Sequence, residues 1–245
     1  MGRFPGLGLE SPPMPLPGLG LALFLGLAAP AAKGALPALP PLEKGTLRVY
    51  LVRHGQALSN LDPTPDLPPE KLDHLTELGQ KQADRAGRAL LGKGISLVLT
   101  SPASRARETA VRIASALDAP KPTVEPRLRP FALGQGKNGK PLDWDDRIAD
   151  WRAGYDRSPT GGESIEQMGT RVAELVSALA KERGDRSVVL VAHGEVIGAY
   201  VGHLRRIPPT ERYPWDIANA SITVVDTGAD GRSRLRFSNH RPPEP

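Results

Sequence analysis

The chain has 245 residues, of which 39% are hydrophobic and 24% charged, and its formal net charge is +5. These values are ordinary for a globular protein of one large domain or two small ones, and the absence of cysteine excludes disulfides, thiolate catalysis and Cys-ligated zinc. The positive charge is modest and lacks a Lys/Arg run with interleaved aromatic residues, so we expect a small anionic partner and no nucleic acid.

Residues 1–45 differ from the rest of the chain in their content of Gly, Pro, Leu and Ala. Residues 19–29 form an apolar block that is too short to span a membrane and is typical of a signal peptide, with Ala29-Pro-Ala31 as a candidate cleavage site. A disordered leader, or a start at Met14, is the alternative. We therefore expect a leader over 1–45, export to the periplasm (or else a cytoplasmic location), no stable membrane anchor after its removal, and a folded domain over 46–245.

A buried strand is predicted over residues 47–52, where five of the six residues are apolar or aromatic. It continues directly into Arg53-His54-Gly55, where burial of the charge would be costly without a partner. The carboxyl ends of strands are where open α/β sheets bind ligands. We expect a polar site here, with Gly55 allowing a tight turn.

A helix over 77–91 follows, with Thr76 as its N-cap and apolar residues at helical spacing. A second strand is predicted over 95–100. Ser101-Pro102 then indicates the N-cap and first residue of a helix that extends to residue 117.

The remaining residues continue the alternation of strands and helices. In order, the pattern predicts a short strand at 124–126, an irregular insertion over 126–162 with a short helix around 143–153, a long helix from Glu163 to Arg183, a buried strand over 187–193, a helix from Glu195, and a closing hairpin over 221–225 and 234–237. Such alternation predicts a three-layer α/β/α sandwich with a mostly parallel central sheet.

Three of these strands end in residues that suit one anion site. Arg53 and His54 follow the first strand, Arg105 lies in the helix after the second, and His193 ends the fourth. If the strands are parallel, these side chains converge in one crevice, where guanidinium groups and a helix N-terminus offer donors to an anion. A neutral imidazole there is suited to nucleophilic attack on phosphorus, and phosphoryl transfer needs mainly positioning and charge stabilisation.

Six pieces between residues 47 and 223 carry a resemblance: Leu-Val-Arg-His-Gly-Gln-Ala-Leu-Ser-Asn60, Leu-Thr-Glu-Leu-Gly-Gln-Lys-Gln-Ala, Thr-Ser-Pro-Ala-Ser-Arg-Ala-Arg-Glu-Thr-Ala, Gly-Gly-Glu-Ser164, Val-Ala-His-Gly and Asn-Ala-Ser-Ile-Thr223. In this order they resemble the histidine phosphatase superfamily, also called phosphoglycerate-mutase-like. The resemblance implies that His54 is the phosphorylated nucleophile. It also implies that Arg53, Arg105 and His193 stabilise the transferring phosphoryl group.

Three further residues are candidates for substrate binding, namely Asn60, Gly194 and Glu163. Asn60 would contact the phosphoryl group by the same resemblance, and its alternative role is that of a turn residue. Glu163 is equally well explained as a first-turn helix residue favoured by the helix dipole. Arg105, for its part, could simply pair with Glu108 one turn along its helix.

One position departs from the family pattern. The family usually shows Leu-Arg-Glu after the third strand, with the Glu as general acid, whereas this chain has Leu128-Arg129-Pro130. Losing a positioned acid costs about 10²–10⁴-fold in rate, and the cost is greatest for alkoxide leaving groups. We therefore expect an anhydride, acyl phosphate or phosphohistidine substrate unless another carboxylate substitutes. Glu195 is one candidate, and Asp143, Asp145 and Glu163 are others.

Trp144 and Trp151 lie in the predicted insertion, where we expect them to pack it over the sheet, with a lid over the crevice as the alternative. No His/Asp/Glu cluster has the spacing of metal ligands, so neither a metal nor a cofactor is predicted.

The sequence thus predicts a metal-independent phosphatase that acts on a small phosphorylated substrate or a phosphoprotein through phospho-His54. The substrates would be phosphate monoesters, anhydrides or phosphohistidine. One rival is a cofactor-dependent phosphoglycerate mutase, although Gln56 and Pro130 depart from the usual mutase pattern. The other is a weakly active phosphate-binding or interaction module, which the loss of the acid would favour.

Overall fold

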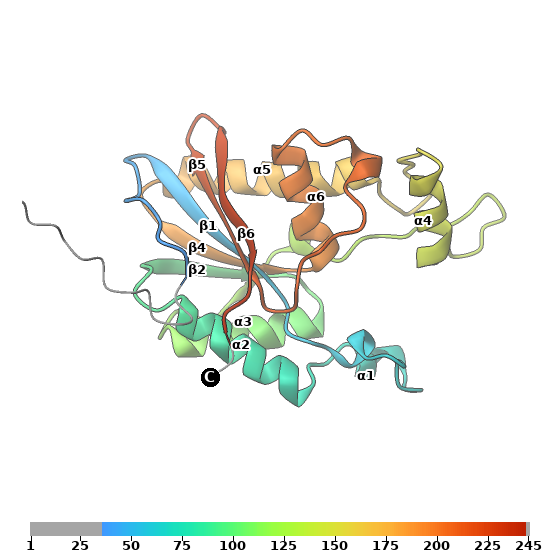
Figure 1. Cartoon of the computed structure of the whole chain (residues 1–245), viewed down its shortest axis with the longest axis horizontal. Coiled ribbons are helices and arrows are strands. Elements are labelled where there is room, and N and C mark those ends of the chain that lie inside the picture. The colour runs from blue at the N-terminus through green and yellow to red at the C-terminus, as the bar shows by residue number, and fades with distance from the viewer. Residues whose placement is uncertain (1–35, 244–245) are drawn as a thin grey trace, which may run out of the picture. The chain divides into compact units, whose positions relative to one another are not determined.

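The computed structural model describes residues 36–243, which form a six-stranded sheet covered by helices (Figure 1). The strand order is β3-β2-β4-β1-β5-β6. Neighbouring strands among β1 to β4 pair in parallel, and β5 and β6 add an antiparallel edge. The strands are β1 (Thr46–Arg53), β2 (Ile95–Thr100), β3 (Thr123–Val124), β4 (Ser187–Ala192), β5 (Ile222–Gly228) and β6 (Ser233–His240).

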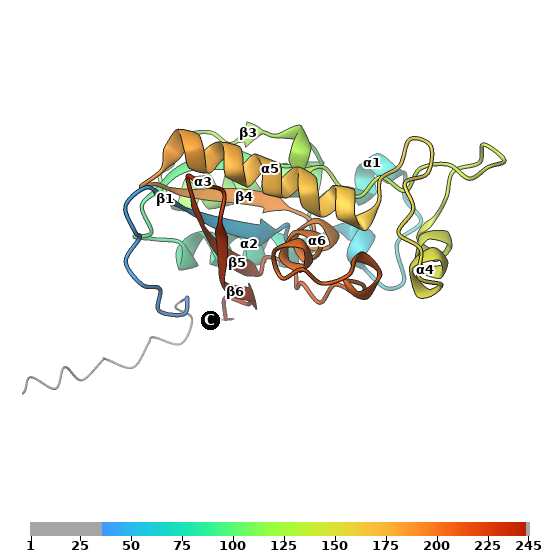
Figure 2. The same ribbon diagram turned by 90° about the horizontal axis from the view of Figure 1, so that it is seen from above.

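Helices cover both faces of this sheet (Figures 1 and 2). Helices α2 (Glu77–Ala89) and α3 (Ser104–Ala116) pack on one face, and α5 (Ile165–Arg183) and α6 (Gly194–Leu204) pack on the other. Two shorter helices, α1 (Pro69–Leu72) and α4 (Trp144–Arg152), lie beside the sheet (Figures 1 and 2). Alternate residues of β1 enter opposite core layers, as the pleat of a strand requires. Val49 and Leu51 pack in the layer with α5 and α6, and Tyr50 and Val52 in the layer with α2 and α3. The three-layer α/β/α sandwich is confirmed.

The starts of α2 and α5 follow capping signals in the sequence. The hydroxyl of Thr76 accepts from the N–H of Gly79, which starts α2 as predicted. The long helix α5 differs slightly, because Ser164 is its N-cap and forms a capping box with Gln167. Glu163 therefore lies before the helix, and its first-turn role is wrong.

The start of α3 also differs from the prediction. The helix begins at Ser104 with Ala103 as N-cap, so Ser101 and Pro102 lie outside it. The side chain of Ser101 is fully buried and hydrogen-bonds the ring of His193. A tertiary contact has therefore replaced the local capping role that Ser-Pro indicates.

The insertion over 126–162 contains α4. Its Phe131, Trp144 and Trp151 form an aromatic cluster with Tyr213 and Trp215 from the segment after α6. Trp151 is buried in the core, as predicted for packing over the sheet, whereas Trp144 is 42% exposed. The fully buried guanidinium of Arg147 holds the loop by donating to three carbonyl oxygens, those of Leu133, Arg157 and Glu163.

Part of the predicted leader packs on the domain. Leu36 is buried in the core layer of α2 and α3, and the carbonyl of Pro40 accepts from Arg48. The core therefore has contributions from residues before Thr46, where we expected the fold to begin. The apolar block at 19–29 and the cleavage site at 29–31 lie outside the described residues, whose helices include none long and apolar enough to cross a membrane.

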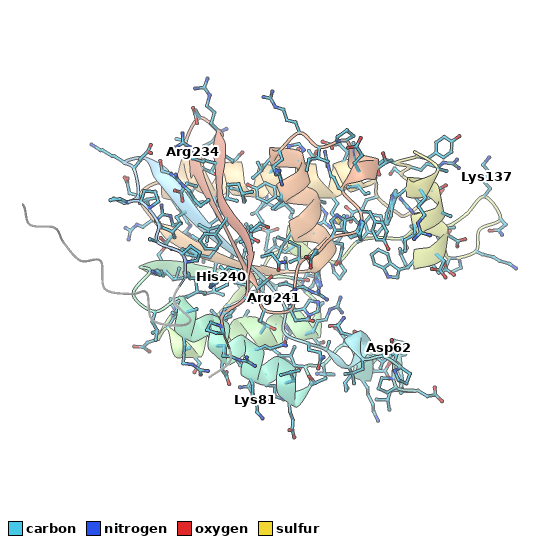
Figure 3. All side chains as sticks on the ribbon, viewed as in Figure 1. Asp62, Lys81, Lys137, Arg234, His240 and Arg241 are labelled. Atoms are coloured by element: carbon cyan, nitrogen blue, oxygen red, sulfur yellow. The ribbon has the colours of Figure 1, made fainter. Side chains whose placement is uncertain are left out.

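Cationic side chains are distributed over the surface. Figure 3 shows Lys81 on α2, Lys137 in the insertion and Arg234 on β6, each pointing outward from a different part of the fold. This distribution agrees with the modest, dispersed charge of the sequence.

Candidate active site

The central strands end at the same level of the sheet. In the parallel registers, Arg53 lies opposite Ala192, and Thr100 lies opposite Val191. The residues that come next, His54, Ser101 and His193, therefore emerge together. The predicted convergence at the carboxyl ends of the strands is confirmed.

Gly55 follows His54 because two backbones cross there. A Cβ atom on Gly55 would lie 2.3 Å from the carbonyl oxygen of Gly79 in α2, and one on Gly79 would lie 2.0 Å from that of Gln56. Gly55 does not adopt a positive φ, and residues 54–56 form neither a turn nor a bend, so the expected tight turn is wrong. The glycine instead permits close contact between α2 and the loop after β1.

The ring of His54 is held in one tautomer. Its Nδ1 lies 2.7 Å from the carbonyl oxygen of Gly55, which can only accept, so Nδ1 carries the proton. Nε2 accepts from Nε of Arg105 at 3.1 Å. Burial, together with Arg105 and Arg53, lowers the pKa of His54 well below its ordinary value of 6.5. The site therefore presents a neutral imidazole whose Nε2 carries no proton and faces Arg105.

The second histidine is oriented from both sides. Nδ1 of His193 accepts from Nη2 of Arg105 at 3.2 Å, and its protonated Nε2 donates to the hydroxyl of Ser101 at 2.7 Å. The rings of His193 and His54 have centroids 5.2 Å apart. Burial is the main cause of the strongly lowered pKa of His193, with smaller effects from His54 and Arg105.

Arg105 connects the two histidines to the loop before α2. Its Nη1 pairs with the carboxylate of Asp73, whose other oxygen accepts from the N–H of Ser104 at the start of α3. The alternative pairing of Arg105 with Glu108 is wrong, because the carboxylate of Glu108 instead accepts from the N–H of Leu75 and contacts His74. Asp73 thus fixes the guanidinium that faces both imidazoles.

Arg53 supplies a second guanidinium. Nη1 donates to the carbonyl of Ile217 at 2.6 Å, while Nε is buried with no hydrogen-bond acceptor among residues 36–243. Gly194 lies against it, since a Cβ there would come within 3.3 Å of Nε. Burial and the neighbouring Arg105 lower the pKa of Arg53. A buried donor without an acceptor is what an incoming oxyanion would satisfy.

Asn60 lies in the turn after His54. Its Oδ1 accepts from the N–H of Ala57 at 3.0 Å and is 3.4 Å from Nδ2 of Asn219. Asn219 also donates to the carbonyl of His54 at 3.1 Å. The turn-residue interpretation of Asn60 is therefore confirmed, and its contact with a phosphoryl group stays a prediction.

The two glutamates named by the sequence have different surroundings. Glu163 is buried and paired with Arg171 and Arg129, and it also accepts from the N–H of Ala132. Glu195 is partly exposed in the first turn of α6, and its carboxylate lies 3.5 Å from the N–H nitrogen of Phe131. Both flank the segment around Pro130 from different elements.

The other two acid candidates lie at the start of α4, where Asp143 is the N-cap and Asp145 belongs to the first turn. The carboxylate of Asp143 caps that helix by accepting from the N–H of Asp146 at 2.9 Å. It therefore has a structural role in the insertion.

Three positioning residues escaped the sequence analysis: Ser101, Asp73 and Asn219. Ser101 was interpreted as an N-cap, and Asp73 lies in a loop without periodicity. Asn219 is the first residue of the motif Asn-Ala-Ser-Ile-Thr223, and that motif is the signal that could have identified it. Within residues 36–243, no group of three or more His, Asp or Glu side chains is arranged to hold a metal ion.

Comparison with known proteins agrees with this geometry. Residues 49–240 match the family model of the histidine phosphatase superfamily (branch 1). A curated relative from Yersinia pestis, named probable phosphoglycerate mutase GpmB, is 32% identical over 193 residues and spans 74% of this chain and 85% of the relative.

Two solved structures are also similar. A mycobacterial glucosyl-3-phosphoglycerate phosphatase in complex with VO3 is 31% identical, covers 79% of this chain and 99% of its own, and has a TM-score of 0.61. A phosphoserine phosphatase from Entamoeba histolytica covers 79% of this chain and 96% of its own with a TM-score of 0.63, and at 21% identity it supports the fold alone.

Proposed function

We propose that this chain, which belongs to the histidine phosphatase superfamily and is a phosphoric-ester hydrolase, acts through a phosphohistidine intermediate on His54. The proposed reaction needs no metal ion. The observation that carries this proposal is the position of the neutral imidazole of His54. Its Nε2 accepts a hydrogen bond from Arg105, and its ring lies beside that of His193. Nucleophilic catalysis requires such an activated and positioned lone pair.

In the first step, Nε2 of His54 attacks phosphorus, a bond forms between them, and the bond from phosphorus to the leaving oxygen breaks. Arg105 exchanges its hydrogen bond to Nε2 for one to a phosphoryl oxygen, and Arg53 offers an Nε that finds no acceptor among residues 36–243. The single ring proton of neutral His193 is directed at Ser101, so this ring lines the position without donating to it. Donors fixed in advance stabilise the charge that develops on the phosphoryl oxygens, and removal of one such donor costs about 10²–10³-fold in kcat.

In the second step, water attacks the phosphohistidine. The nitrogen–phosphorus bond breaks, inorganic phosphate leaves, and the neutral imidazole returns with its Nδ1 proton still directed at the carbonyl of Gly55. The tautomer of His54 is therefore the same before and after a cycle.

The test is a trapping experiment with 4-nitrophenyl phosphate. We expect a phosphate label on His54 that is stable in alkali and labile in acid, as expected for phosphohistidine, together with release of inorganic phosphate. Turnover without any label would contradict the covalent mechanism.

Phosphoglycerate mutase activity is the second candidate, because curated relatives carry that name. A mutase returns the phosphoryl group to the bound product, whereas a phosphatase passes it to water. Incubation with 3-phosphoglycerate separates the two, since isomerisation would indicate a mutase and phosphate release a phosphatase. Binding of phosphate without turnover would instead favour the non-enzymatic module.

A further inference from the structure

The two-step scheme leaves one carboxyl of the crevice without a role. Glu195 is the second residue of α6 and follows His193 by two positions. Its neighbour Gly194 lies against the guanidinium of Arg53, and its carboxylate lies 3.5 Å from the N–H nitrogen of Phe131, next to Pro130. The carboxyl therefore belongs to the same crevice as the two imidazoles.

The neighbouring carboxylates are held by guanidinium groups. Asp73 pairs with Arg105, and Glu163 pairs with both Arg171 and Arg129. Glu195 forms no salt bridge within residues 36–243 and is held by N–H groups only, its own and that of Phe131. Of these three carboxylates, it is the one without a guanidinium partner among the described residues.

The surroundings of Glu195 also favour its protonated form. Burial raises the pKa of its carboxyl above the ordinary value, and this effect exceeds the opposing influence of Arg105, Arg53 and the two N–H groups. A general acid works best when its pKa lies close to the working pH. The side chain nevertheless keeps some exposure, so it can exchange protons with water.

We propose that Glu195 is the general acid of the reaction, which rests on the proposed function. As the bond between phosphorus and the leaving oxygen breaks, the carboxyl proton of Glu195 moves to that oxygen, so the product leaves as a neutral alcohol. In the second step, the carboxylate accepts a proton from the attacking water, which restores the acid. Protons and bonds balance over the cycle without another reactant.

This assignment changes the expected substrate class. Pro130 cannot donate a proton, and without an acid only leaving groups that depart readily as anions would react well. With Glu195 in place, the enzyme acts on phosphate monoesters of alcohols, whose leaving groups need protonation. Phosphorylated sugars and hydroxy acids belong to this chemical class.

The experiment measures kcat/KM of the full chain and of Glu195→Gln with two substrates. One is 4-nitrophenyl phosphate, whose leaving group is a stable anion, and the other is glycerol phosphate, whose leaving group is an alkoxide. We expect the variant to lose about 10²–10⁴-fold on glycerol phosphate and far less on 4-nitrophenyl phosphate. The basic limb of its pH profile on glycerol phosphate should also disappear.

Glu166→Gln is the matched control, because Glu166 is likewise the second residue of its helix and pairs with His203 and Arg212 away from the crevice. It should leave the ratio of the two rates unchanged. An equal loss on both substrates in Glu195→Gln would assign a merely structural role to the residue. A selective loss in Glu163→Gln instead would assign the acid to Glu163.

A failure of the phosphohistidine mechanism gives a different result from a failure of the general-acid role of Glu195. A wild-type protein that forms no phosphohistidine with 4-nitrophenyl phosphate lacks the mechanism itself, and the role of Glu195 falls with it. A wild-type protein that labels His54 but does not hydrolyse glycerol phosphate keeps the mechanism and overturns the general acid.

Discussion

Arg105 donates to Nε2 of His54 at 3.1 Å although the two residues are 51 positions apart in the chain. The same guanidinium donates to Nδ1 of His193 and pairs with Asp73. A single side chain on α3 therefore connects the ends of β1 and β4.

Replacement of the nucleophile should abolish turnover. We expect His54→Ala to reduce hydrolysis of 4-nitrophenyl phosphate to the background rate and to prevent phosphate labelling. The reason is that no other described imidazole accepts a hydrogen bond from Arg105 at its Nε2. His203→Ala is the control, since His203 pairs with Glu166 on the outside of α6. A label that persists in His54→Ala would place the intermediate elsewhere.

Removal of the connecting guanidinium should slow the chemical step. In Arg105→Ala both histidines lose a donor, so we expect kcat to fall about 10²–10³-fold, as for other fixed donors at a developing charge. Arg107→Ala provides a comparison from the exposed face of the same helix. Single-turnover kinetics should show the loss in the phosphorylation rate. A change in KM alone would contradict this role.

The acid limb of the pH profile should lie below the ordinary pKa of histidine. Burial, Arg105 and Arg53 lower the pKa of His54, so the imidazole stays neutral, and active, at pH values where a free histidine is protonated. Replacement of Arg105 by Gln removes one of these causes and should move the limb to higher pH. kcat/KM measured with 4-nitrophenyl phosphate between pH 4 and 8 tests this (roughly the span over which such shifts fall).

Stability should decrease as the pH falls below 6.5, the ordinary pKa of histidine. His54 and His193 are neutral when folded, and the unfolded chain binds more protons than the folded one between their lowered pKa values and 6.5. The free energy of unfolding therefore rises with pH in this window and is constant above it for these two groups. Thermal denaturation of the wild type and of His54→Asn checks the sign, because the variant should show a smaller slope.

The backbone crossing should not tolerate a side chain. In Gly79→Ala the new methyl group would meet the carbonyl of Gln56, so the chain must shift, and we expect a loss of roughly 1–3 kcal/mol in the free energy of unfolding. Gly136→Ala, whose Cβ would meet only the side chain of Asn138 and then atoms at 3.4 Å or more, is the control. Urea denaturation of both variants measures the difference.

The strand ends could be predicted from the sequence because hydrophobic runs mark β1, β2 and β4 and polar residues follow each one. Arg53, His54 and His193 lie next to those runs, and Arg105 lies one turn into a helix. Their convergence follows from parallel pairing alone. The sequence could therefore predict the centre of the site from local patterns.

The surrounding contacts depend on tertiary structure that local patterns do not contain. Ser101 has the composition of an N-cap, but a hydrogen bond to His193 competes with that role. Gly55 looks like a turn residue, but the proximity of Gly79, distant in sequence, explains it. Asp73 gave no signal, because the loop that carries it is fixed by its partners and not by its own periodicity.

The Nε of Arg53, which finds no acceptor in the part of the chain that the structure describes, has a thermodynamic consequence. A buried donor without an acceptor costs about 1–3 kcal/mol, and folding alone does not recover this amount. An oxyanion that accepts a hydrogen bond from this nitrogen would remove that cost. Inorganic phosphate or vanadate should therefore raise the melting temperature of the wild type by more than that of Arg53→Met. Part of the binding free energy of an oxyanion would thus come from pairing a donor that the described part of the chain leaves without an acceptor.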